Sequence, residues 1–489
     1  MGVQQTVQRS ESPITHGGAI YLRVHSGAEN KFWFGGARYS PNTNYQNVAR
    51  YGKSLFIDAD DLMLTVPENT SEKIGYRLDQ YQSDEESNLE NLQGYDRKDN
   101  GTGAGAFPIP MFYLYTHVDY CVHNVDNPIA PYISPYDIKY GHDDAACGHY
   151  RWPCYSIEYA KDVSYRRHVT NHSLGLDADH RWNVRKVGIM TGYTMNISYS
   201  NWFNGSIFEI QNSYPPLGQY GGTYLNSEFK ISSGQYFNID NTQNSDKSFE
   251  MRMLDIKIED GTDNYIIQAF NRVAEIQIFE CTLTMFNSGS ISRGLVDLRK
   301  GTLTMIYLNA YNITLPNGPL FKPIQTAGLV SISGSQFTSI QRSDAGGSVI
   351  SRVITGRYDG VNIRTSQFTS CSVTGSNQSG GAININIKNS AEAKFEIIEY
   401  WEKKTTFSNC SSTDRGGAIY LDLAAGQEQN FDLRGARYAD DNFATNGRSI
   451  FINAQGDLRI AVPENQGVKI GAGLESYEEF NLDNLMGYD

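Results

Sequence analysis

The sequence predicts an all-β protein built as a parallel β-helix, and three observations lead to this prediction. A block that begins GGAIYL at Gly17 returns at Gly416, and 13 of the first 23 aligned residues are identical. Residues 183–415 contain short segments in which apolar and polar residues alternate, as in strands with one buried face. Glycine pairs begin at Gly346, Gly380 and Gly416, at intervals of 34 and 36 residues. Recurrence at such intervals is typical of stacked β-coils.

The repeated block extends well beyond its first residues. Both copies next read G-[KR]-S-[LI]-F-I-x-A, then Asp-Leu, then Val-Pro-Glu-Asn, over Gly52–Asn69 and Gly447–Asn465. Both end on N-L-x-G-Y-D, at Asn91–Asp96 and Asn484–Asp489. From these repeats and from composition we divide the chain into a lead-in arm (1–16), β-helix module copy 1 (17–96), a linker and irregular Tyr/His/Cys-rich insert (97–182), central β-helix coils (183–415) and β-helix module copy 2 (416–489).

The central region supplies the strand and corner signals. Segments such as 250–260 and 274–286 are expected to be strands, and no amphipathic helix interrupts them. A phrase F-x-x-[IC] starts at Phe337, Phe368 and Phe407, and a glycine pair follows each time. Glycine before a buried strand allows a positive φ at a tight corner. The competing prediction, a series of β-sandwiches, would need frequent hairpin turns, and Asn-Gly or Asp-Gly signals are sparse here.

The G-G-A-I repeats, at Gly17–Ile20, Gly380–Ile383 and Gly416–Ile419, resemble those of polymorphic outer-membrane proteins and of autotransporter-like right-handed β-helix proteins. The later G-x-S-I-F-I-x-A phrase is similar to the closing coil of such passenger domains. In that family the turn is usually F-x-x-N, whereas this chain has Cys371 and Cys410 in the last place. The resemblance covers roughly 17–70 and 330–465, and no membrane barrel follows the repeats. It implies a right-handed β-helix at a cell surface and carries over no catalytic residue.

Composition narrows the classes of partner. The net charge is −13 and lacks the basic character that a nucleic-acid partner would require. No apolar run is long enough for a membrane span, and the N-terminus lacks the apolar core of a signal peptide. N-x-[ST] sequons that could carry N-linked glycans lean the prediction toward an extracellular or cell-surface location. They occur at Asn69, Asn100, Asn171, Asn196, Asn204, Asn312, Asn377 and Asn409.

The histidine-rich insert is the best place to look for a metal. His168 and His172 would share one face of a helix, and Asp177, Asp179 and His180 follow closely. Imidazole and carboxylate ligands at such spacing could hold zinc. The set matches no motif of known specificity, so we expect hydrogen-bonded or solvated histidines, with no metal and no cofactor.

The cysteines have different expected roles. Cys147 and Cys154, with six residues between them, either close a small disulfide loop or remain buried thiols. Cys371 and Cys410 occupy equivalent turn positions, where stacked coils would bring them near each other. Adjacent coils are about 4.8 Å apart, wider than the Cβ separation of a relaxed disulfide. We therefore expect thiols in an internal ladder.

Catalysis on a β-helix would need carboxylates beside Arg or Lys on one face. Asp422, with Arg23 at the matching place in copy 1, is one candidate acid. Asp255, Lys257 and Glu259 alternate along one strand and would share a face. Alternating charges are also normal on an exposed strand, and we do not expect an enzyme.

The recurring GARY and VPEN elements fit a structural role. Arg38 and Arg437 belong to the first element, and Glu68 and Glu464 to the second. A pairing of these glutamates with the arginines across a turn is a hypothesis about proximity.

The leading functional hypothesis is an extracellular structural protein, a subunit of a fibre or surface stalk. A β-helix leaves unpaired backbone groups at its ends, and similar ends allow head-to-tail contacts that form a homo-polymer. The first alternative is a monomeric adhesin or glycan-binding surface module. The second is a polysaccharide lyase or hydrolase.

Overall fold

The computed structural model describes most of residues 184–489 and selected stretches before them. The earlier stretches are chiefly 19–34, 54–66, 92–97, 109–111, 120–122 and 154–160. In the later part, gaps longer than one residue fall at 190–191, 201–206, 213–226, 240–246, 260–264, 270–273, 287–292, 324–326, 464–466 and 472–480. Backbone contacts divide the chain into two units, Met1–His180 with Lys186–Met190 and Arg181–Arg185 with Thr191–Asp489. The insert 97–182 falls almost entirely within the first unit, together with copy 1.

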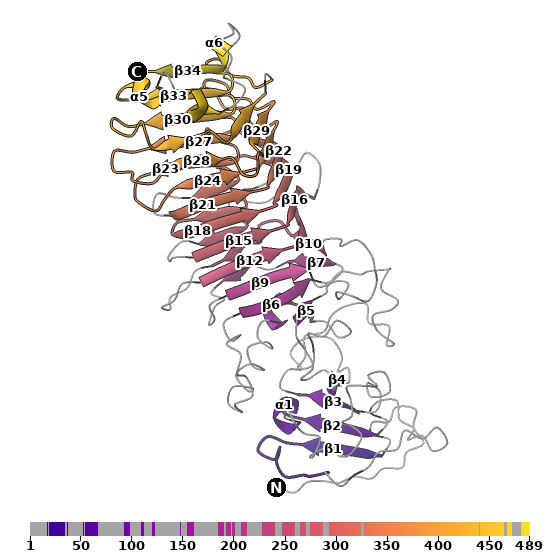
Figure 1. Ribbon diagram of the computed structural model, residues 1–489. Coiled ribbons are helices and arrows are strands. Elements are labelled where there is room, and N and C mark those ends of the chain that lie inside the picture. The colour runs from indigo at the N-terminus through magenta and orange to yellow at the C-terminus, as the bar shows by residue number, and fades with distance from the viewer. Residues whose placement is uncertain are drawn as a thin grey trace. The chain divides into compact units, whose positions relative to one another are not determined.

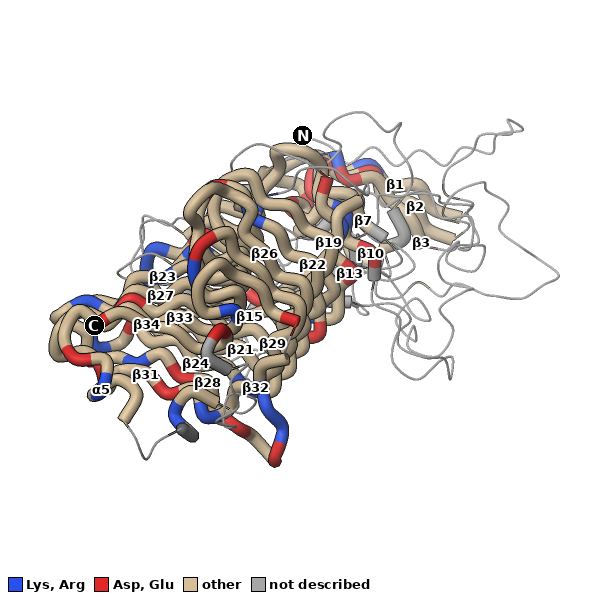
Figure 2. Tube along the Cα trace, turned by 90° about the horizontal axis from the view of Figure 1, so that it is seen from above, with Lys and Arg blue, Asp and Glu red and all other residues tan. Residues whose placement is uncertain are grey.

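The second unit confirms the predicted fold, a right-handed parallel β-helix within a solenoid of about nine turns. Successive turns add strands to three parallel sheets, which run as stacked arrows up to β34 beside the C-terminus (Figure 1). Figure 2 shows Lys and Arg interspersed with Asp and Glu along the described trace.

The three sheets have the following strands in stacking order. The first contains β7 (Gly192–Met195), β10 (Ser227–Ile231), β13 (Leu254–Ile258), β16 (Thr282–Met285), β19 (Asn309–Leu315), β22 (Gln336–Arg342), β25 (Gln367–Thr369), β29 (Thr405–Ser408) and β32 (Ala436–Tyr438), and β26 (Ser372–Val373) also pairs with β22. The second contains β8 (Tyr199–Ser200), β11 (Phe237–Asn238), β14 (Ile267–Ala269), β17 (Val296–Leu298), β20 (Phe321–Pro323), β23 (Ile350–Ile354), β27 (Ile383–Ile387), β30 (Ile419–Leu423), β33 (Ile450–Ala454) and β34 (Leu485–Tyr488). The third includes β9 (Ile207–Asn212), β12 (Lys247–Arg252), β15 (Ala274–Phe279), β18 (Gly301–Ile306), β21 (Ala327–Ser333), β24 (Val361–Arg364), β28 (Phe395–Ile398) and β31 (Phe431–Asp432).

The turns in the middle of this unit have a constant length of 27 residues. Asp255 pairs with Thr282, Thr282 with Asn309, and Asn309 with Gln336. Along these strands alternate residues are buried, for example in the pattern buried–intermediate–buried of β13. A constant turn length places the same face of every strand toward the interior, because a slip by one residue would expose the apolar set.

A left-handed corner residue sets this length. Met253, Glu280, Tyr307 and Gly334 are spaced 27 residues apart, with φ angles of 51°, 52°, 56° and 60°. Each stands where a strand of the third sheet ends and a strand of the first begins. A left-handed conformation costs a non-glycine residue about 1–2 kcal/mol, which the ladders on both sides of the corner offset.

These corners divide segments that the sequence predicts as continuous. Residues 250–260 contain the end of β12 and all of β13, and residues 274–286 contain β15 and β16. Met253 and Glu280 carry no turn signature, since neither is Gly, Asn or Asp. The expectation of one strand in each segment was therefore wrong, although strand content and alternation were right.

The F-x-x-[IC] phrase forms a second series of corners. Its phenylalanines are fully buried and stacked, with ring centroids 5.0 Å apart for Phe337–Phe368 and 4.8 Å apart for Phe368–Phe407. The third residue of the phrase has a positive φ, as at Ser370 (54°) and Asn409 (51°). The phrase therefore combines an interior aromatic column with a backbone reversal.

The glycine pairs lie at corners that have positive φ, as predicted. Gly347, Gly380 and Gly416 have φ angles of 73°, 74° and 61°. A Cβ added to Gly416 would lie 2.1 Å from the carbonyl oxygen of Ile419, so no side chain fits there.

The first unit contains a smaller sheet with helix α1 (Leu62–Thr65). Strands β1 (Ile20–Val24), β2 (Leu55–Ala59) and β3 (Leu92–Asp96) are parallel, and β4 (Ile109–Pro110) pairs antiparallel with β3. Strand β5 (Tyr120–Val122) pairs in parallel with β6 (Val184–Ile189). The remaining helices, in the second unit, are α5 (Leu458–Ala461), the 3₁₀ helix η3 (Gly467–Ile470) and α6 (Asn481–Asn484).

Gly416→Ala should lower the melting temperature much more than Gly426→Ala. Both glycines have positive φ, so both variants bear the same kind of backbone cost. Only the Gly416 variant adds a steric clash, because nothing lies within 4 Å of a Cβ at Gly426. Thermal melts followed by circular dichroism provide the comparison, and equal losses would contradict the steric argument.

Candidate functional site

The repeated block folds into the same structure in both units. We call β1, β2, α1 and β3 the N-terminal module, and β30, β33, α5 and β34 the C-terminal module. In each, three parallel strands pair in the same register, with the first residues aligned as Ile20–Leu55–Leu92 and Ile419–Ile450–Leu485. The short helix follows the second strand in both.

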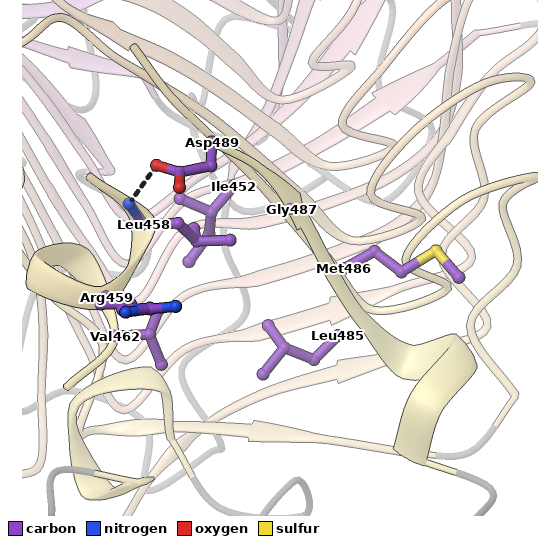
Figure 3. Close-up of a pocket in the computed structure, with 8 residues that line it drawn as sticks. All are labelled: Ile452, Leu458, Arg459, Val462, Leu485, Met486, Gly487 and Asp489. Atoms are coloured by element: carbon purple, nitrogen blue, oxygen red, sulfur yellow. Dashed lines mark hydrogen bonds between the residues drawn. The ribbon is translucent and has the colours of Figure 1, made fainter. Parts of the chain in front are cut away.

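One hydrogen bond ties the helix to the third strand in both modules. Asp96 accepts a hydrogen bond from the backbone N–H of Leu62 at 3.2 Å. In the C-terminal module Asp489 accepts one from the N–H of Leu458 at 3.0 Å (Figure 3). A carboxylate suits this place because the first N–H groups of a helix have no partner within the helix.

An outward-facing aromatic column also recurs. In the N-terminal module the Phe56 ring lies 5.9 Å from Tyr21 and 4.9 Å from Tyr95. In the C-terminal module Phe451 lies 6.1 Å from Tyr420 and 5.0 Å from Tyr488. The column of the C-terminal module ends in an exposed ring, since Tyr488 is 49% exposed.

The modules differ at the outer edge of the third strand. In the N-terminal module, β4 pairs with β3 so that Ile109 lies opposite Gly94 and Pro110 opposite Gln93. Met111 follows and is only 3% exposed. Its Cε would be 3.3 Å from a Cβ built on Gly94, so its side chain covers this glycine.

No strand in the described part of the chain pairs with the outer edge of β34, and a pocket of about 390 Å³ lies beside it. Leu458, Val462 and Leu485 point toward this space between α5 and β34 (Figure 3). The full lining is Ile452, Leu458, Arg459, Val462, Leu485, Met486, Gly487 and Asp489. Leu62, the counterpart of Leu458, is fully buried in the N-terminal module, whereas Leu458 is partly exposed. The C-terminal module therefore has an open apolar end where the N-terminal module is covered.

A polar cluster occupies the flank of the N-terminal module. Asp58, with a side chain 6% exposed, accepts two hydrogen bonds from Arg97 at 2.6 Å and one from Tyr21 at 2.9 Å. Burial alone would raise the pKa of Asp58, but the hydrogen bonds from Arg97 and Tyr21 outweigh burial and lower it. Burial and the bond to Asp58 raise the pKa of Tyr21 to about 12. Arg23 lies 3.8 Å from Asp58.

The candidate acid of the second copy is held by amides. Asp422 accepts hydrogen bonds from Asn386 and Asn453, both at 2.7 Å, and from Gln455 at 3.2 Å. It is matched by Arg23 in the other module, as the alignment predicted. Such an amide ladder between stacked strands is a stabilising cross-strand contact.

The second group of charged candidates, on β13 and just after it, forms ion pairs. Lys257 contacts Glu228 and lies 3.8 Å from Asp255, while Glu259 contacts Lys230 at 2.8 Å. Asp255 and Lys257 share the less buried face of β13, as predicted from their alternation.

The candidate metal ligands His168, His172, Asp177, Asp179 and His180 lie outside the described residues. Within the described residues, no group of three or more His, Cys, Asp or Glu is placed to hold a metal ion. The hypothesis that Glu68 and Glu464 pair with Arg38 and Arg437 also falls on undescribed positions, except for Arg437.

Cys147 and Cys154 form a disulfide, with Cα atoms 4.8 Å apart. Cys371 and Cys410 are free and fully buried, which confirms the expected thiol ladder. Burial raises the pKa of the Cys371 thiol well above its usual value, so this group stays protonated.

Four of the eight sequons have a described asparagine, and all four are exposed: Asn196, Asn312, Asn377 and Asn409. The asparagines of the other four, Asn69, Asn100, Asn171 and Asn204, lie outside the described residues.

Met111 and the two module glycines, Gly94 and Gly487, are the site residues that sequence analysis missed. Gly94 and Gly487 recur within the N-L-x-G-Y-D ending, and this recurrence was the available signal. Met111 lies in a stretch that resembles a linker, so its contact with the module is visible only in the structure.

Comparison with protein-family models, with curated proteins and with solved structures found no match to this chain. None of the described helices is both long and apolar enough to cross a membrane. The resemblance to polymorphic outer-membrane proteins stays a prediction.

Asp58→Asn should weaken the N-terminal module at neutral pH, and the difference from wild type should shrink below about pH 4. The folded pKa of Asp58 is lowered, so its stabilising effect is present above the unfolded pKa and is lost as pH falls through the folded value. Hydrogen exchange of peptides from β1 to β3, measured at both pH values, provides the test. Asp483→Asn is the control, because that carboxylate is exposed and belongs to the other unit. A difference that persists unchanged at low pH would contradict the prediction.

Proposed function

We propose that this protein is an extracellular structural subunit, which assembles end to end into a fibre or surface stalk. The observation that carries the proposal is the open end of the C-terminal module, in a chain that holds a second copy of the same module. Unpaired strand edges attract further strands unless they are covered.

The N-terminal module supplies a matching edge. Among the described strands, β1 pairs only with β2, just as β34 pairs only with β33. Continuing the ladder from β34 to β1 of the next copy would place Leu485 beside Ile20 and Tyr488 beside Arg23. These are an apolar contact and a cation–π contact.

The proposed contact joins different surfaces on the two copies. A heterologous contact of this kind builds an open filament when its rotation does not close into a ring. Assembly would then depend on concentration.

The extracellular location rests on two observations. The Cys147–Cys154 disulfide suits an oxidising compartment, where such bonds form and persist. The four described sequons are exposed, as acceptors of N-linked glycans must be.

Met486→Lys should reduce assembly strongly, because a lysine in the middle of an exposed edge strand opposes pairing. The module tolerates a polar side chain there, since Gln93 is the counterpart in the N-terminal module. Ile460→Lys is the matched control, on α5 and 48% exposed but outside the pocket lining.

Sedimentation velocity over a wide concentration range, together with negative-stain microscopy, measures assembly in all three proteins. Polymers of wild type and of the control, but not of Met486→Lys, would support the proposal. Dispersed wild-type monomers at high concentration would overturn it.

One observation favours the alternative of a glycan-binding adhesin. Tyr400 and Lys403 pair in a two-residue hairpin whose central residues, Trp401 and Glu402, both have positive φ. Trp401 is 79% exposed, and its ring lies 5.8 Å from that of Tyr400. A strained turn that presents aromatic rings to solvent is typical of a binding feature. Saturable glycan binding that Trp401→Ala abolishes, without polymers, would favour this function.

A further inference from the structure

We propose that the open end of the C-terminal module binds an extended peptide segment of another polypeptide, of the type Ile-Pro-Met, antiparallel to β34. The methionine of the segment fills the pocket beside Gly487. The N-terminal module shows this arrangement already formed within one chain, and the proposal transfers it between equivalent positions.

The acceptor surfaces correspond residue by residue. Gly487 occupies the position of Gly94, and Leu458 that of Leu62, in the same strand register. A Cβ built on either glycine would lie near the leucine of its own helix, at 3.2 Å in the N-terminal module and 3.0 Å in the C-terminal module. Both modules therefore form the same notch between the third strand and the helix.

The occupant of this notch in the N-terminal module is known. Ile109 and Pro110 extend β3 on its outer edge, and Met111 closes the notch as a buried side chain. Proline suits an edge strand because it has no N–H to leave unpaired. Methionine suits an irregular apolar gap because its unbranched side chain is flexible.

The open notch requires the same chemistry. Its lining combines apolar side chains, among them Ile452, Val462 and Leu485, with an unpaired strand edge. Strand addition to a sheet edge gains main-chain hydrogen bonds, and a pocket beside it selects one side chain. A long apolar side chain that follows a two-residue strand fits both features.

The segment comes from another polypeptide because the chain's own Ile109–Met111 is already in use on β3. Transfer of that segment to β34 would uncover one notch while it covers the other, with no net gain of contacts. The inference goes beyond end-to-end assembly, since a monomer would bind the segment equally well. In a fibre, the bound segment would block the growing end.

The first test uses a fluorescent peptide with the sequence of residues 107–113, FPIPMFY, added to the whole protein. Polarisation should show saturable binding, and Met111→Asp in the peptide should weaken it about tenfold or more, since a charge would be buried in an apolar pocket. Val462→Arg in the protein should weaken binding similarly by filling the pocket. Ile460→Arg, the same substitution on the same helix, should leave it unchanged. Binding that Val462→Arg does not affect would overturn the proposal.

The second test fixes the register and does not depend on the fold of the Val462 variant. Because Gln93 pairs with Pro110, the equivalent pair is Met486 with Pro110 of the peptide. A peptide with Pro110→Cys should form a disulfide with Met486→Cys and not with Tyr488→Cys, in a glutathione redox buffer. A peptide with Pro108→Cys should show the opposite preference. Equal trapping of both pairs would overturn antiparallel pairing.

A third arm distinguishes this inference from the proposed assembly. A peptide of residues 17–25, which contains β1, represents the edge of a second copy. If it competes and FPIPMFY does not bind, end-to-end assembly stands and this inference fails. If FPIPMFY binds and wild type never polymerises, the inference stands and the assembly proposal fails.

Discussion

The backbone reversal between sheets is the constraint on which the whole β-helix depends. Parallel strands keep their register only if each turn uses the same number of residues before the next strand begins. Here a left-handed residue at the corner fixes that number at 27 over Met253, Glu280 and Tyr307. Each such residue costs about 1–2 kcal/mol by itself, and the cost is tolerated because both flanking strands are hydrogen-bonded and their alternate side chains buried.

Much of the fold could be predicted because stacking repeats its sequence requirements. The phenylalanine column at Phe337, Phe368 and Phe407 and the positive-φ glycines both appear as recurring phrases. The 27-residue corners could not be predicted, since Met253 and Glu280 have side chains with no turn preference. Their conformation follows from the ladders around them, and local propensity alone does not determine it.

The site shows the same division between local and distant causes. The repeated N-L-x-G-Y-D ending indicated that two modules share one structure, and the register of β3 and β34 confirms it. That one module is covered and the other open depends on Met111, which lies outside the repeat. Duplication copied the acceptor surface without its occupant. Two acceptors and one covering segment in a single chain make the open end the feature that most requires a partner.

The constant spacing of the corners also determines how such a protein can change its length. A segment that runs from one corner residue to the next, such as residues 254–280, contains one complete set of strands and the reversal that ends it. Duplicating or deleting that segment leaves every remaining side chain above an equivalent neighbour, because a whole rotation has been added or removed. Insertions of any other size must loop outward. The gene of a β-helix can therefore lengthen the protein in whole turns, by in-frame recombination, without redesigning the interior.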